Sequence, residues 1–253
     1  MDQVRTARAR RLRPYFEVQL RFAQALAERL GEPLTQVALT HTNLHRRFGL
    51  GAPEGPARPE WAAYAEGLGA AASLEAQLDW TETVFVRSPE ESSGRPAFGC
   101  FSYDAPNAEG EVRIHFTNRD ADDVSPLAAE KVPRRLADLR AMFADVRERH
   151  PQAGFVRGGS WLYNIEAYRR LFPPAYGASR RAPERVHLNG TSSWGQFLDH
   201  REAIKPAARD AFLADLPRLD PAAPWTAFPL RALHVRAPIG LFYAFYGLAP
   251  APA

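Results

Sequence analysis

The sequence predicts an α+β protein, in which a helical N-terminal part is followed by a mixed sheet with helices packed on it. Through about the first 95 residues, apolar side chains recur at helical spacing, as Phe16, Leu20 and Ala23 do. From residue 96 the pattern changes to short runs rich in aromatic and β-branched residues, separated by turn residues. The expected parts are a helical domain (1–95), an α/β domain (96–248) and a frayed tail (249–253).

The strongest structural signal lies in residues 111–173, which read as strand, long helix, strand, turn and short helix. Ser125-Pro126 offers a helix start and His150-Pro151 an end. Pro133 lies inside this pattern, so the helix either kinks or truly begins there. Between them runs an apolar stripe formed by Leu136, Leu139, Phe143 and Val146. A strand, a helix and a second strand usually make a parallel pair, and ligands collect at the carboxyl ends of such strands.

Weaker patterns predict the remaining elements of the α/β part. A hairpin is expected from the runs 97–103 and 111–117, and a broken helix from 194–216. Further strands are expected over 185–188, 228–235 and 239–246.

Composition narrows the class of protein. The 253 residues are 45% hydrophobic and 24% charged, as in soluble globular proteins, and no apolar run approaches a membrane span. The single cysteine, Cys100, excludes an internal disulfide and fits a reducing cytoplasm. The net charge is only +3, and the arginine-rich usage is typical of a GC-rich bacterial genome. A nucleic-acid binder would show a denser basic stripe, so we expect a cytoplasmic protein without membrane or nucleic-acid partners.

Several short motifs follow one another in a fixed order in the second half. They are Ile114-His115-Phe116, Pro126-Leu127, the helix end Phe143…His150-Pro151, Ser160-Trp161-Leu162 and Leu171-Phe172-Pro173. Over about residues 111–216, this succession resembles the GNAT-like acyltransferases that have a helical N-terminal domain. The resemblance implies two neighbouring parallel strands, here 111–118 and 154–163, which diverge to hold the pantetheine arm of an acyl-CoA.

The resemblance also places the pyrophosphate of that donor at the start of the intervening helix. The family's Gly-rich turn is replaced here by residues 118–125, which have no glycine and contain Asp120, Asp122 and Asp123. These carboxylates repel a pyrophosphate, and Arg119 can offset only one of them. The cofactor is therefore left open: acyl-CoA is the donor that the resemblance implies, and the acidic turn predicts that CoA binds poorly.

Acyl transfer from a thioester to an amine is the implied reaction. His115 or a water that it orients would take the amine proton, and Tyr163 or Tyr168 would protonate the leaving thiolate. A backbone N–H near Gly159 would hold the thioester carbonyl. The residues expected to bind ligand, from strand ends and turns, are Asn118, Gly158, Gly159, Ser160, Asn164, His187 and Asn189.

Each of these residues also has a structural interpretation, and other functions stay open. The two glycines can form a bulge, the tyrosines can pack at a core edge, and the asparagines can shape turns. One alternative function is a non-catalytic ligand-binding or scaffold protein. Another is a metal-dependent enzyme built on His41 and His45, which are four residues apart on an expected helix, although no third ligand can be named. The acceptor, the acyl chain and the oligomeric state are not specified.

Overall fold

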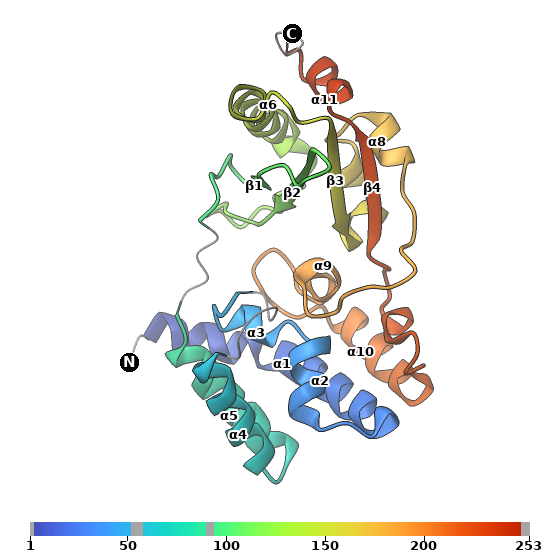
Figure 1. Cartoon of the computed structure of the whole chain (residues 1–253). Coiled ribbons are helices and arrows are strands. Elements are labelled where there is room, and N and C mark those ends of the chain that lie inside the picture. Colours follow the sequence, from blue (N-terminus) through green and yellow to red (C-terminus); the bar gives the residue numbers. More distant parts are fainter. Residues whose placement is uncertain (1–2, 52–57, 90–93, 249–253) are drawn as a thin grey trace. The chain divides into compact units, whose positions relative to one another are not determined.

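The computed structural model describes residues 3–51, 58–89 and 94–248 and has the predicted α+β class (Figure 1). The chain forms two compact units. The first is drawn from Met1–Ser92 and Arg185–Arg231, and the second from Ser93–Glu184 and Ala232–Ala253. Residues 185–231 thus group with the N-terminal helices, whereas the sequence places them in the α/β domain. The predicted tail, 249–253, lies outside the described residues.

Helices build the first unit. They are α1 (Gln3–Leu30), α2 (Leu34–His41), α3 (Leu44–Arg47), α4 (Pro59–Ala70), α5 (Leu74–Arg87), α9 (Thr191–Trp194) and α10 (Pro206–Asp215), with 3₁₀ turns η3 (Gly195–Phe197), η4 (Leu216–Arg218) and η5 (Pro224–Ala227). The ring of Phe22 on α1 lies 5.4 Å from that of Trp194 and 5.7 Å from that of Phe212. This aromatic packing holds the later segment against the first helix. No described helix is both long and apolar enough to cross a bilayer.

One prediction for the later segment of this unit is wrong, because residues 185–188 form no strand, and only Leu188 among them is buried. The break expected in the helix over 194–216 is present. Residues 198–205 are not helical, and α10 begins at Pro206, which occupies its first turn.

A four-stranded sheet forms the second unit. Its strands, in spatial order, are β1 (Phe101–Asp104), β2 (Glu111–Phe116), β3 (Phe155–Ser160) and β4 (Leu233–Pro238). The β1–β2 hairpin is antiparallel, β2 and β3 are parallel, and β4 is antiparallel to β3. The helices are η1 (Ala129–Lys131), α6 (Val132–Arg149), η2 (Trp161–Asn164), α7 (Glu166–Arg169), α8 (Pro174–Ala178) and α11 (Ile239–Phe245). In Figure 1, β3 and β4 run side by side with α8 next to β4. The predicted hairpin and the predicted parallel pair joined by a helix are both confirmed.

The start of one element and the type of another are settled by the structure. The long helix begins at Val132 with Pro133 in its first turn, which is the later of the two starts that the sequence offers. The last strand is β4, and the run expected as a strand over 239–246 is helix α11. Its buried residues are Ile239, Phe242, Tyr243 and, at its C-cap, Tyr246. This i, i+3, i+4, i+7 spacing is helical, although aromatic residues favour strands on average.

Strands β2, β3 and β4 bury one face only, whereas Phe101–Tyr103 of β1 are all buried. Along β2, β3 and β4, buried residues such as Val112, Val156 and Val235 alternate with exposed arginines. The buried face packs against α6, whose Leu139, Phe143 and Val146 are fully buried, while Leu136 is only partly buried. The ring of Phe143 lies 4.8 Å from that of Phe242 and 5.4 Å from that of Tyr246.

Replacing Phe143 by Ala should therefore lower the free energy of unfolding by about 3–5 kcal/mol, because it removes a buried ring and leaves a cavity. Denaturant unfolding measures the change. Glu148→Ala, at an exposed position of the same helix, is the control and should stay within about 0.5 kcal/mol of wild type. A loss below about 1 kcal/mol for Phe143→Ala would show that this stripe is not part of the core.

Candidate functional site

The sheet opens between its two parallel strands. β2 and β3 pair at three positions, the last of which joins Arg113 to Arg157. Beyond that position, Ile114–Phe116 and Gly158–Ser160 are not paired with each other, although each segment stays paired with its outer neighbour, β1 or β4. The strands therefore separate at their carboxyl ends, where ligands bind in open α/β sheets.

His115 stands at this opening and is held by a carboxylate. Its Nε2 lies 2.7 Å from Oδ2 of Asp104, and Arg95 Nε donates to the other oxygen at 2.6 Å. Burial alone would raise the pKa of Asp104, but the hydrogen bonds with His115 and Arg95 hold that pKa well below its usual range. An ionised carboxylate fixes the orientation of an imidazole, and the His115 side chain keeps 23% of its surface exposed.

Tyr163 and Tyr168 lie in the core together with Tyr176. The hydroxyls of Tyr163 and Tyr176 are 2.9 Å apart, and the rings of Tyr163 and Tyr168 are 5.3 Å apart. Burial raises the pKa of all three phenols well above the ordinary value. Phenols in this state are weak acids, and their hydroxyl bonds stabilise the packing of the segments that follow β3.

The two glycines of β3 have different neighbours. A Cβ on Gly158 would lie 2.0 Å from the hydroxyl oxygen of Tyr163 and 2.7 Å from that of Tyr176, so this glycine lets the phenols reach the backbone. Gly159 faces the other side of the sheet, where a Cβ would lie 3.2 Å from Cδ2 of His234. The one-to-one register with β4 from Phe155 to Ser160 leaves no bulge at either glycine.

The other predicted residues of the second unit make local turn contacts. Ser160 Oγ accepts a hydrogen bond from Leu162 N at 3.1 Å and caps η2. Asn118 Oδ1 accepts from Asp120 N at 3.1 Å. Asn164 Nδ2 donates to a backbone carbonyl at 2.8 Å. These bonds fix the conformation of the chain where it leaves β2 and where it leaves β3.

His187 and Asn189 belong to the first unit, not to the sheet. His187 is exposed, and the backbone oxygen of Asn189 accepts from Arg46 Nε at 3.1 Å. Neither residue follows a strand, contrary to the pattern that suggested them.

The premise of the metal alternative is wrong. His41 ends α2 and His45 belongs to α3, so the two imidazoles do not share a helix. The break falls at Asn43, which is buried and whose backbone N–H donates to the side chain of Gln19 at 3.0 Å. His45 Nδ1 lies 3.1 Å from the Gly51 carbonyl oxygen. Among the residues that the structure describes, no group of three or more His, Cys, Asp or Glu side chains could hold a metal ion.

Two carboxylates of the acidic turn, residues 118–125, form ion pairs with cationic side chains. The side chain of Asp120 is 2% exposed, and it binds Lys131 Nζ at 2.6 Å and an Arg135 guanidinium nitrogen at 2.8 Å. Lys131 also reaches Asp122 at 2.5 Å. Burial would raise the pKa of Asp120, but these cations hold it below its usual value. The expectation that only Arg119 offsets the turn is therefore wrong, and the turn repels an anion less than the sequence predicts.

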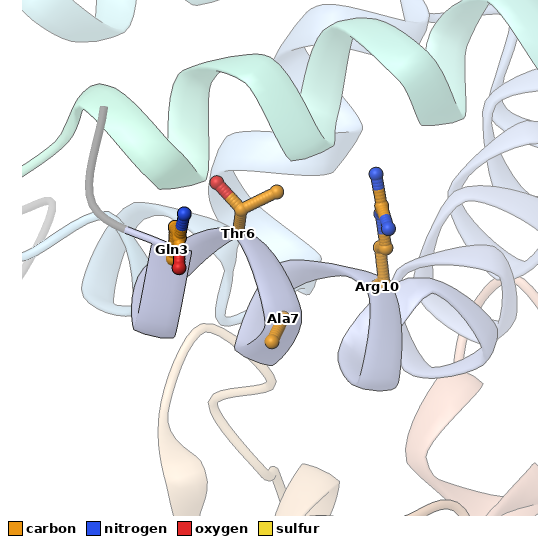
Figure 2. Close-up of a pocket in the computed structure, with 4 residues that line it drawn as sticks. All are labelled: Gln3, Thr6, Ala7 and Arg10. Carbon is orange, nitrogen blue, oxygen red and sulfur yellow. The ribbon is translucent and has the colours of Figure 1, made fainter.

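A pocket of about 300 Å³ lies on α1, in the first unit (Figure 2). Its lining residues, Gln3, Thr6, Ala7 and Arg10, come from successive turns of one helix. In Figure 2 the side chains of Gln3, Thr6 and Arg10 point the same way. The lining offers no carboxylate, imidazole or thiol, so we assign it no catalytic role.

The sequence also contains a signal that the predicted residue set misses. Arg113, Arg157 and Arg236 each stand between two buried residues of a strand, which places all three on the exposed face of the sheet. Period-two alternation in the three strands could have revealed this grouping.

No family model, curated protein or solved structure matches this chain. Its function is therefore argued from its own residues.

Replacing Gly158 by Ala should lower the free energy of unfolding by about 1–3 kcal/mol or more, because the new methyl group overlaps two phenol hydroxyls. Denaturant unfolding reports the change. Gly154→Ala is the matched control, since a Cβ there meets no atom within 4 Å. Equal effects of the two substitutions would contradict the packing role of Gly158.

Replacing Asp120 by Asn should destabilise the protein by roughly 3 kcal/mol at pH 7, because Arg135 is left buried without its main carboxylate. A carboxylate with a lowered folded pKa contributes its full stabilisation above the unfolded pKa of about 3.9 and loses it as pH falls toward the folded pKa. The difference between wild type and variant should thus shrink below about pH 4.

Urea unfolding at a series of pH values tests this dependence. Asp210→Asn removes an exposed carboxylate paired with Arg209 and should show no such trend. A wild-type-to-variant difference that stays constant down to pH 3 would contradict the role given to Asp120.

Proposed function

We propose that the second unit is a GNAT-like acyltransferase-type module that transfers an acyl group from a thioester to an amine at the β2–β3 opening. The observation that supports this most is the early end of the parallel pairing after Arg113 and Arg157. It leaves the carboxyl ends of β2 and β3 unpaired with each other, in two strands that α6 connects along the chain. An oriented histidine, His115, stands on the β2 end. The thioester arm would lie between those strand ends.

In this proposal His115 handles both proton transfers. It accepts the amine proton as the new C–N bond forms and returns that proton to the thiolate as the C–S bond breaks. Asp104 keeps the imidazole oriented. A backbone N–H near Gly159 would bind the carbonyl oxygen as its charge develops. Because the phenols of Tyr163 and Tyr168 are buried and weakly acidic, the proposal does not use them as the acid.

A non-catalytic ligand-binding protein is the second candidate for the same opening. The ring of Phe116, at the end of β2, lies 5.5 Å from the buried ring of Tyr168. Aromatic side chains thus close the core side of the opening, and a ligand would have to approach from the exposed side. A protein of this kind would bind a thioester without cleaving it.

The proposal predicts saturable binding of acetyl-CoA by calorimetry and release of free thiol when a panel of primary amines is added. The protein's own Cys100 is buried, so a thiol reagent should give little background in the folded state. His115→Ala should slow thiol release by about 10²–10⁴-fold while leaving acetyl-CoA affinity unchanged, since it removes proton transfer and no donor contact.

Two further variants sharpen the test. Asp104→Asn should slow release less than His115→Ala, because the imidazole stays while its charged partner is lost. His200→Gln, in the first unit, should have no effect. If wild type and every variant bind acetyl-CoA but release no thiol, the non-catalytic alternative is favoured. Thiol release that His115→Ala does not slow would overturn the assignment of His115 as the base.

A further inference from the structure

Three arginines form a row across the exposed face of the sheet. Arg113 on β2 pairs in register with Arg157 on β3, and Arg157 pairs with Arg236 on β4. All three are exposed. Neighbouring strands lie about 4.8 Å apart, and like charges directly opposite each other destabilise a sheet. A bound anion would lower this cost.

An imidazole and a fourth arginine lie at the same place. His234 lies on the exposed face two residues before Arg236, beside Gly159. Arg181 is bound to it through two backbone hydrogen bonds of 2.9 Å. Burial and then the charges of Arg181, Arg113 and Arg157 lower the pKa of His234. Three arginines thus act on one imidazole, which marks the centre of the cluster.

One carboxylate offsets part of the positive charge of this row. Glu111 reaches Arg236 Nε at 2.6 Å and Arg157 Nε at 3.6 Å. It is shared between two guanidinium groups, so the pair keeps a net positive charge, and Arg113 stands beside them in the register.

We propose that this arginine face, formed by Arg113, Arg157, Arg181, His234 and Arg236, binds a small ligand that carries at least two linked phosphate groups. Guanidinium groups bind phosphate oxygens in pairs, and several of them on adjacent strands suit a ligand with more than one negative charge. Gly159 contributes by its lack of a side chain, which leaves room for the imidazole beside the backbone.

A small polyphosphate fits the face better than a nucleic-acid strand does. Strand-binding sheets offer open aromatic rings on which bases stack. The aromatic ring of this face belongs to Phe155, and the Arg236 guanidinium carbon lies 3.5 Å from its centre, so the ring is covered. The charges also converge on His234 and do not run as a long stripe. The inference goes beyond acyl transfer, since it requires no thioester.

Calorimetric titration with inorganic pyrophosphate and with ADP, at about 0.1 M salt, tests the proposal. Both should bind saturably, orthophosphate should bind more weakly, and affinity should fall as salt rises. Arg157→Gln should weaken pyrophosphate binding at least tenfold, because Arg157 is the centre of the row. Arg149→Gln, an exposed arginine of α6 in the same unit, is the matched control and should bind as wild type does.

A stability measurement separates a binding role from a structural one. Arg157→Gln relieves repulsion between neighbouring arginines and loses the 3.6 Å contact with Glu111. Both effects are small at an exposed position, so its unfolding temperature should stay close to that of wild type while binding is lost. Unchanged pyrophosphate affinity in Arg157→Gln, or no saturable binding of pyrophosphate or ADP by wild type, would overturn the proposal. So would a single-stranded oligonucleotide that binds more tightly than pyrophosphate and is not displaced by it. Pyrophosphate binding without acetyl-CoA turnover would support this site while rejecting the proposed function.

Discussion

The second unit depends on a sheet that is covered by a core on one face only. Because side chains alternate along each strand, one residue faces aromatic rings and the next faces solvent. The adjacent residues Gly158 and Gly159 illustrate this alternation, because they face opposite sides of the sheet. The first makes room for the hydroxyls of Tyr163 and Tyr176 in the core, while the second lies beside His234 on the exposed face. Shifting the register by one residue would bury the arginines and expose the aromatic contacts, so the register is strongly specified.

The loop between β2 and α6 depends on a second constraint, the burial of a carboxylate. Asp120 lies almost wholly out of solvent, and Lys131 and Arg135 at the start of α6 satisfy it. A buried ion pair adds little net stability but costs much to break, so it selects one loop conformation. The same pairs reduce the negative field at the helix start. Anion binding near that helix is therefore less disfavoured than the bare sequence of the turn suggests.

Local patterns predict much of this fold, and long-range packing decides the rest. The β2–α6–β3 unit could be predicted because each of its elements has a clear period of its own. The aromatic composition of residues 239–246 favours a strand, but the helical spacing of Ile239, Phe242 and Tyr243 prevails and this segment forms α11. For the site, the position of His115 at the end of β2 follows from sequence, but its partner Asp104 depends on the hairpin register. The burial of Tyr163 and Tyr168 has no local signal, since it arises from contacts with Tyr176 and Phe172.

The exposed face also connects the two proposals physically. Arg113 and His115 are two residues apart on β2, so both point to the same side of the sheet, and Asp104 faces that side as well. A ligand whose phosphates rest on the arginine row would therefore have its remaining part near the opening between β2 and β3. Since aromatic rings close the core side of that opening, the exposed face is the side from which a reacting group can arrive. Charge on the sheet would then supply binding and orientation, and the imidazole at the strand end would supply proton transfer.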